Sequence, residues 1–224
     1  GPLPAPLTAM RLPAVAAPPL LKAGASDYEV EAGRLRNGWA TADDRYGEGY
    51  TAAGFRAGLG AQVTAEARAE WTPSRTAAGL EMSRGFGAAG TVRAVLAQSD
   101  TAKQSGLRWG MGLVGNSEGT AWTLSWDGFE RGYTPLAATS DEASPRGRVQ
   151  ADATLSLGGG ASAGLGYTRQ TTWTSGTADV LGLSARFPLL KRSSLSINYS
   201  LRPGAQPGWQ AGLLLDVPLS DARL

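Results

Sequence analysis

Hydrophobic and polar residues alternate along most of this chain of 224 residues. The alternation is clearest in residues 148–169, which read RVQADATLSLG followed by GGASAGLGYTR. Successive side chains of a β-strand point to opposite faces, so each half of this stretch has one apolar and one polar face. Three glycines, residues 158–160, lie between the halves and allow a tight reversal. The stretch therefore predicts a hairpin of two antiparallel strands.

The same alternation recurs from Asp27 almost to the end of the chain, in about twelve segments of roughly 9–12 residues. In VTAEARAEW, for example, the apolar face from Val63 to Trp71 opposes a threonine, two glutamates and an arginine. Tilted strands of about ten residues are long enough to cross a bilayer, whereas strands of soluble proteins have about five or six. The pattern therefore predicts an all-β fold, an antiparallel transmembrane β-barrel segment of about twelve strands.

The first 26 residues differ from the rest, because six prolines there forbid a helix or a central strand. We predict a proline-rich lead-in over residues 1–26, with one short edge strand near Met10–Val15, and the barrel segment over residues 27–224; a disordered linker is the alternative for the lead-in. Long loops are expected at 37–48 and 132–147, and short turns at Pro73 and residues 158–160. Such unequal connections are typical of outer-membrane barrels.

The polar face carries charged residues in the middle of the predicted strands, where a water-filled lumen tolerates them and lets them pair. Glycine is also frequent on this face, where it allows strong curvature or close approach. The residues expected to line the lumen are Glu66, Arg68, Arg93, Arg108, Arg148, Asp152, Arg186 and Asp216.

The apolar face carries large aromatic residues, several of them near the ends of segments. Tryptophan and tyrosine favour the membrane interface, where the ring is in lipid and its polar atom stays wet. The residues expected there are Trp71, Trp109, Trp122, Trp126, Tyr167, Tyr199 and Trp209. The alternative is a soluble, glycine-rich β-sandwich with these aromatic rings in its core.

The composition excludes several kinds of chemistry. The chain has no cysteine and no histidine, which removes disulfides, thiol chemistry and a Ser–His–Asp triad, and makes a zinc site unexpected. Glu66 and Glu70 share a face but lie roughly 13 Å apart along a strand, too far to share a proton. The net charge is +2 without a run of like charges, and no apolar stretch is long enough for a transmembrane helix. We therefore predict no catalytic, cofactor-binding or metal-binding residues and no nucleic-acid partner.

Several segments, in order and spacing, resemble one protein family. They are LLKAGASDYEVEAGRLR (20–36), GLGAQVTAEARAEW (58–71), GTVRAVLAQSD (90–100), FERGY (129–133), and SLSINYS (194–200) with GWQAGLLLDVPLS (208–220). Together they are similar to the outer-membrane ushers of the chaperone–usher pathway, which assemble fimbriae. One departure is Arg56-Ala57-Gly58, where the family usually has Arg-Tyr-Gly.

The resemblance implies a bacterial (Gram-negative) outer-membrane pore that takes pilus subunits from a periplasmic chaperone and secretes them without a cofactor. It also implies that this chain is the middle-to-late wall of a larger barrel, a pore wall surrounded by outer-membrane lipid and not an enzyme. The alternative functions are a small self-contained porin or an autotransporter-type barrel, which would share the same two-faced strands.

Overall fold

The computed structural model describes residues 19–37, 45–134, 145–174, 176–190, 193–204 and 207–217. These residues form strands joined by turns, with one short 3₁₀ turn, η1 (Gly87–Ala89). The strands are β1 (Ser26–Asn37), β2 (Arg45–Gly60), β3 (Val63–Thr72), β4 (Arg75–Gly85), β5 (Thr91–Thr101), β6 (Ser105–Ser117), β7 (Thr120–Phe129), β8 (Pro145–Gly158), β9 (Ala161–Thr172), β10 (Gly176–Leu190), β11 (Ser193–Arg202) and β12 (Gly208–Asp216). The prediction of an all-β chain with about twelve long strands is confirmed.

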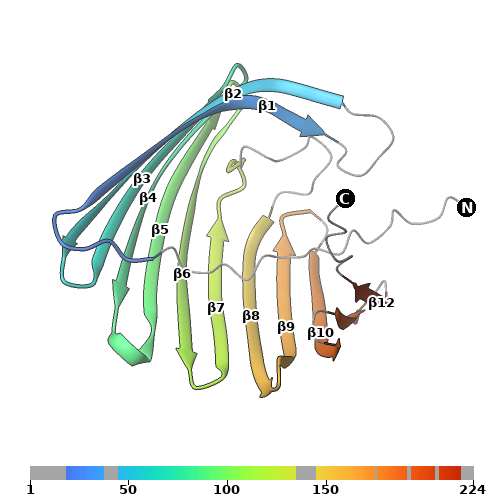
Figure 1. Ribbon diagram of the computed structural model, residues 1–224. Helices are drawn as coiled ribbons and strands as arrows, with labels where there is room; N and C mark the ends of the chain where they lie inside the picture. The colour runs from blue at the N-terminus through green and yellow to red at the C-terminus, as the bar shows by residue number, and fades with distance from the viewer. Residues whose placement is uncertain are drawn as a thin grey trace, which may run out of the picture.

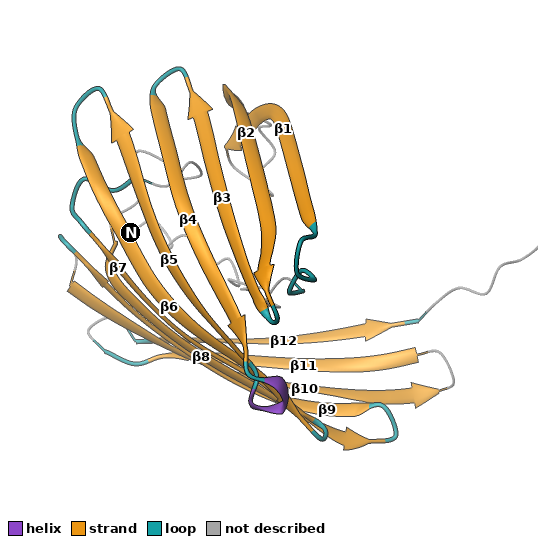
Figure 2. Ribbon diagram, turned by 90° about the vertical axis from the view of Figure 1, so that its left-hand side faces the viewer, coloured by secondary structure: helices purple, strands orange, loops and turns teal. Residues whose placement is uncertain are grey.

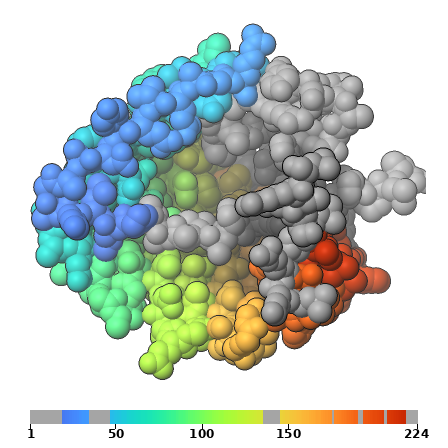
Figure 3. Space-filling model, viewed as in Figure 1, coloured from blue at the N-terminus to red at the C-terminus, as the bar shows by residue number. Residues whose placement is uncertain are grey.

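All twelve strands belong to one antiparallel sheet, in which each strand pairs with its neighbours in sequence. The sheet curves strongly, as Figures 1 and 2 show, and its strands form an arc from β1 to β12 in the space-filling view (Figure 3). In the described part of the chain β1 and β12 are the two ends of the sheet and do not pair with each other. The fold is therefore an open part of a barrel, and the alternative of two packed sheets is wrong.

The pairing register keeps the two faces separate from strand to strand. Leu80 of β4 lies opposite Leu96 of β5, which lies opposite Trp109 of β6. On the other face, Thr168 of β9 lies opposite Gln150 of β8. Because the side-chain period is two, a slip of one residue in any strand would mix the faces. The alternation read from the sequence thus becomes one continuous apolar face and one continuous polar face.

The apolar face lies on the outside of the curve and has no protein layer over it in the described structure. Its side chains are the exposed ones, with Leu213 71% and Trp209 69% exposed, whereas Thr64, Ser83 and Ser99 on the polar face are buried. Large apolar side chains gain about 1.5–3 kcal/mol each on leaving water. The outer face therefore requires an apolar surrounding.

The connections at the two ends of the sheet differ in length. At one end the turns between β2 and β3, β6 and β7, and β8 and β9 have two residues each (61–62, 118–119 and 159–160), and β4 is joined to β5 by residues 86–90, which include η1. The other end carries the connections 38–44 and 130–144, but also the tight turn at Pro73 and Ser74. The predicted loop over 132–147 extends too far, because β8 begins at Pro145. The predicted edge strand near Met10–Val15 lies outside the described residues.

Candidate pore-lining face

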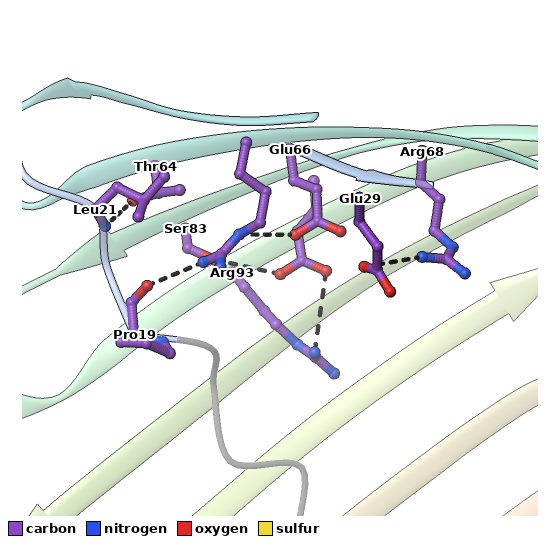
Figure 4. Close-up of polar contacts among 10 residues, drawn as sticks. Pro19, Leu21, Glu29, Thr64, Glu66, Arg68, Ser83 and Arg93 are labelled. Carbon is purple, nitrogen blue, oxygen red and sulfur yellow. Dashed lines mark hydrogen bonds and ion pairs between the residues drawn. The ribbon is translucent and has the colours of Figure 1, made fainter. Parts of the chain in front are cut away.

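Charged side chains from β1 and β3 form a cluster around Arg68 on the inner, polar face. Its guanidinium lies 2.8 Å from Glu70, 3.3 Å from Glu31 and 3.7 Å from Glu29. Figure 4 shows Glu29, Glu66 and Arg68 pointing to the same side of the sheet. Three carboxylates around one cation leave this part of the face with an excess of negative charge. All four side chains are partly exposed, so the pairs contribute little to stability and mainly fix the side chains.

Two like charges face each other next to this cluster. Glu66 of β3 lies directly opposite Glu81 of β4. Each is balanced by an arginine from a flanking strand, since Arg56 lies 3.2 Å from Glu66 and Arg93 lies 4.0 Å from Glu81 (Figure 4). Like charges directly opposite destabilise a sheet, so these arginines offset a repulsion that the strand order creates.

The best-defined ion pair joins Arg108 of β6 to Asp127 of β7. Nε and Nη2 of Arg108 both donate to Oδ1 of Asp127, at 3.0 and 2.8 Å. The guanidinium carbon also lies 5.8 Å from the centre of the Phe129 ring. The centres of the Phe129 and Tyr133 rings are 5.7 Å apart. Burial raises the pKa of the Tyr133 phenol above its ordinary value, although Arg108 acts in the opposite direction.

Tyr133 belongs to a short segment after β7 that folds back over the polar face. The backbone N–H of Thr134 donates to Oγ of Ser99 at 2.8 Å, and that of Leu107 donates to the Glu130 carboxylate at 2.9 Å. A Cβ on Gly106 would overlap the Tyr133 backbone. Glycine at this position therefore allows the segment to lie directly on β6.

The remaining residues predicted to line the lumen make weaker contacts. Arg148 donates twice to Oε1 of Gln170, at 3.1 and 2.8 Å, and Arg186 donates to Oγ of Ser194 at 3.1 Å. Asp152 accepts from Gln150 at 2.8 Å and from Thr123 at 3.4 Å, and Asp216 is exposed at the end of β12. All eight predicted residues lie on the polar face. In the described structure only those on β3, β5 and β6 form ion pairs, and their partners are charged residues outside the predicted set.

The seven predicted aromatic residues all lie on the outer face, at different heights. Trp71 and Trp209 lie at strand ends, next to the end that carries the longer loops. Trp122 lies near the opposite end, above Gly115 of β6, while Trp109 covers Gly128 of β7. Trp126, Tyr167 and Tyr199 lie further from the strand ends. An aromatic ring over a cross-strand glycine fills the space that the glycine leaves.

Sequence reasoning missed where the lead-in lies. The Pro19 carbonyl accepts from Nη2 of Arg56 at 2.9 Å, and the Leu21 N–H donates to Oγ1 of Thr64 at 2.8 Å. Both partners lie on the polar face, and a Cβ on Gly58 would collide with the carbonyl oxygen of Lys22. The described part of the lead-in, residues 19–22, therefore docks on the inner face of β2 and β3 before the chain turns into β1 (Figure 4). Gly58 and Gly85, where a Cβ would meet Lys22 and Leu20, are the sequence signals of this close approach.

Metal binding and helical membrane crossing have no support in the described residues. No group of three acidic residues there could hold a metal ion. No helix in the part of the chain that the structure describes is long and apolar enough to cross a membrane.

Solved structures with a similar fold are translocation pores of a pilus usher. The P pilus usher (PapC) translocation pore matches 90% of this chain and 44% of its own, with a TM-score of 0.64 and 18% identity. A second structure of the usher PapC pore matches 88% of this chain and 46% of its own, with a TM-score of 0.58 and 19% identity. The E. coli P pilus tip assembly intermediate PapC–PapD–PapK–PapG matches 89% of this chain and 27% of its own, with a TM-score of 0.64 and 19% identity.

Comparison of the sequence with family models and with curated proteins finds no match. The chain spans less than half the length of the usher chains whose fold it matches. Its twelve strands nevertheless follow the usher pore over nine-tenths of the chain. The chain therefore has the fold of part of the translocation pore of a pilus usher.

Proposed function

We propose that this chain forms part of the wall of an outer-membrane usher, a pore that secretes pilus subunits delivered by a periplasmic chaperone in a Gram-negative bacterium. In this proposal residues 27–224 belong to the transmembrane barrel, and residues 1–26 are a lead-in that connects to it. Outer-membrane lipid covers the apolar face, and pilus subunits pass along the polar face. The chain carries out no chemical reaction.

The observation that carries the proposal is the fold, a curved sheet that follows an usher pore and places every polar strand face on its inside. Charged residues in the middle of strands, such as Arg108 and Asp127, are then in water and not in lipid. The outer face offers lipid a continuous apolar surface, which explains why its large side chains are exposed in the absence of a protein partner.

The distribution of charge on the inner face supports passage of a polypeptide. On β2 and β3 the inward-facing Arg56 and Arg68 are each paired with carboxylates. On β9 to β12 the inner face is largely serine, threonine, asparagine, glutamine and glycine. Paired charges and small polar side chains give a hydrated surface without strong anchoring points, so a protein cargo slides along it and does not stick.

A crosslinking experiment tests the proposal. The 224 residues have no cysteine, so one cysteine can be placed in this part of the full-length protein, with the unsubstituted protein as the background control. Ser125 of β7 faces the lumen in this proposal, and its neighbour Leu124 lies on the outer face and serves as the matched control. During pilus assembly, Ser125→Cys should crosslink to a cysteine-bearing pilus subunit, and Leu124→Cys should not. The proposal fails if neither variant captures a subunit while pili are being made.

The alternative, a self-contained porin, predicts a different result. The purified 224-residue chain would then form a stable closed pore, with steady conductance in a planar bilayer. The usher proposal predicts no such conductance, because the two ends of the described sheet are not paired with each other.

A further inference from the structure

The first strand of the sheet, β1 (Ser26–Asn37), has a neighbouring strand on one side only. It pairs with β2, and in the described structure the N–H and C=O groups along its other edge face no strand (Figure 2). Its outward side chains Tyr28 and Val30 are 82% and 73% exposed, more than any other large apolar side chain that the structure describes. A free edge of this kind recruits a further strand. Both the backbone and the outward side chains of β1 therefore lack a neighbour on this side.

Three acidic residues alternate along the inward side of β1. They are Asp27, Glu29 and Glu31. The residues of β2 directly opposite them are, in the same order, Arg56, Gly54 and Ala52. Arg56 lies 3.2 Å from Glu66 and donates to the Pro19 carbonyl at 2.9 Å, so it is already engaged. Because glycine and alanine bring no charge, β2 leaves the acids of β1 without a cation of their own.

Arg68 of β3 is the cation that reaches these acids, and it does so across a glycine. Gly54 lies between Glu29 on one side and Arg68 on the other. Because Gly54 has no side chain, the guanidinium extends over β2 and lies 3.7 Å from Glu29 (Figure 4) and 3.3 Å from Glu31. The same group is bound to Glu70 at 2.8 Å. One cation shared among three carboxylates leaves β1 with an excess of negative charge along its free edge.

The other end of the sheet does not carry the complementary charge. The inward residues of β12 are Gln210, Gly212, Leu214 and Asp216. They include no cation, and Asp216 would add negative charge, so closure of the described sheet on itself would leave the acids of β1 unpaired. A second copy of the chain meets the same obstacle, because its β12 has the same residues and its β1 would set acid against acid. The partner of this edge is therefore chemically different from either end of the described sheet.

We propose that the free edge of β1 binds an antiparallel strand with lysine or arginine at alternate inward positions, and that this strand belongs to the same polypeptide outside these 224 residues. This step rests on the proposed function, in which the chain is part of a larger wall, as its match to 44% of the usher pore chain suggests. Cations opposite Asp27, Glu29 and Glu31 form direct cross-strand pairs, and the apolar residues between them cover Tyr28 and Val30. The edge thus selects its neighbour by charge on the inside and by apolar contact on the outside.

Photo-crosslinking of the full-length protein in outer membranes identifies the strand at this edge. Tyr28 is replaced by the photoreactive residue p-benzoylphenylalanine, and mass spectrometry of the irradiated protein identifies the captured peptide. That peptide should come from the same molecule, lie outside the 224 residues, and have lysine or arginine at alternate positions. Mixing isotope-labelled with unlabelled protein distinguishes capture within one molecule from capture between two.

The matched control carries the same photoreactive residue in the middle of the sheet. Leu124 of β7 also lies on the outward side, but β7 is paired on both sides, with β6 and with β8. Its replacement should capture peptides of these two strands and no others. This result establishes that the reagent reports the strands next to it.

Charge reversal tests whether the acids select the captured strand. Glu29→Lys should lower the urea concentration at which half of the protein unfolds in bilayers, and changing a basic residue of the captured strand to glutamate should restore most of that shift. Asp216→Lys, on the inward side of the other end strand, is the control, and the same change on the captured strand should not restore its effect. Heat-modifiable mobility in gels establishes that each variant is folded before the comparison.

The other outcomes overturn the proposal. Capture of β12 would show that the sheet closes on itself, and capture between molecules would assign the edge to a second copy. A captured strand without alternating basic residues, or no recovery on charge reversal, would show that charge does not select the neighbour, and capture of lipid alone would show that the edge stays unpaired. The result is independent of secretion: failure of the edge crosslink while Ser125 still captures a subunit would refute the edge assignment alone, and the reverse would refute the usher proposal alone.

Discussion

Asp127 lies directly opposite Arg148 across β7 and β8, yet its carboxylate is bound by Arg108 of β6. Arg148 instead donates to Gln170 of β9. The inner face therefore combines a diagonal ion pair, Arg108 with Asp127, and a directly opposed contact, Arg148 with Gln170. Each strand of this part of the wall is tied to its neighbour through a side chain as well as through the backbone.

The ion pair between Arg108 and Asp127 predicts that loss of the Asp127 charge destabilises the protein more than loss of an exposed, unpaired aspartate charge. Asp127→Asn removes the charge that holds a partly buried arginine and should lower the free energy of unfolding by about 1–3 kcal/mol. Urea titration of the protein folded in lipid bilayers measures the change. Asp216→Asn, at an exposed position without an ion pair among the described residues, should change it by less than about 0.5 kcal/mol. Equal effects of the two substitutions would contradict the assigned role.

Docking of residues 19–22 on β2 and β3 predicts that a methyl group added at Gly58 releases this segment. Gly58→Ala places a Cβ against the Lys22 carbonyl and should release the segment from the inner face. Trypsin should then cleave after Lys22 roughly tenfold faster, if docking is weakened by about 1.4 kcal/mol. Gly54→Ala, on the same face of β2, meets only the Glu29 Cβ at 3.9 Å and is the control. Peptide mass spectrometry over time follows the cleavage, and unchanged cleavage in Gly58→Ala would refute the docking.

The position of the Trp109 ring over Gly128 predicts that alanine destabilises the protein more at Gly128 than at Gly147, which lies opposite. A Cβ on Gly128 of β7 would overlap the indole of Trp109, whereas the nearest atom to a Cβ on Gly147 of β8 is at 3.6 Å. Gly128→Ala should therefore cost about 1–3 kcal/mol of unfolding free energy, and Gly147→Ala much less. Urea unfolding in bilayers compares the two. A cost for Gly147→Ala as large as that for Gly128→Ala would show that the ring does not cause the difference.

Burial of Tyr133 predicts a pH dependence of stability at alkaline pH. Because its folded pKa is raised above the ordinary value of about 10, the folded state retains the phenol proton that the unfolded state loses. The stabilisation is complete below about pH 10 and is lost as the pH rises through the folded pKa. Tyr133→Phe should flatten this decline in urea titrations between about pH 9 and 11. A decline of the same steepness in Tyr133→Phe would rule out this tyrosine as its source.

The alternation of residues predicted the faces well, for a physical reason. Leu165 and Gly166 are neighbours in sequence and lie on opposite faces, because a strand has no other way to place them. The same rule indicated about twelve long strands and the faces of the eight charged and seven aromatic residues named from the sequence, whereas Arg169 and Asp179 lie on the apolar face and Phe129 on the polar face. Periodicity excludes a slip of one residue, which would place polar side chains in the apolar face, but it leaves slips of two residues open, so the register itself was not predicted.

The contacts between distant residues could not be predicted from the pattern. The choice of Gln170 rather than Asp127 as the partner of Arg148 depends on side-chain reach across the twisted sheet. Arg131, Arg146 and Trp173 meet from two turns and the start of β8, and turns have no periodicity to read. Docking of the lead-in likewise depends on backbone contact at Gly58, which the sequence marks only as a glycine.

The assignment of the polar face to the lumen and the apolar face to lipid is the central claim, and cysteine labelling along β9 tests it most directly. Single cysteines at positions 162 to 168 of the full-length protein in outer membranes are treated with a charged, water-soluble maleimide. The account predicts labelling with a period of two, at the even positions from Ser162 to Thr168 and not at Ala163, Leu165 or Tyr167. Labelling of the odd positions, or uniform labelling along the strand, would contradict it.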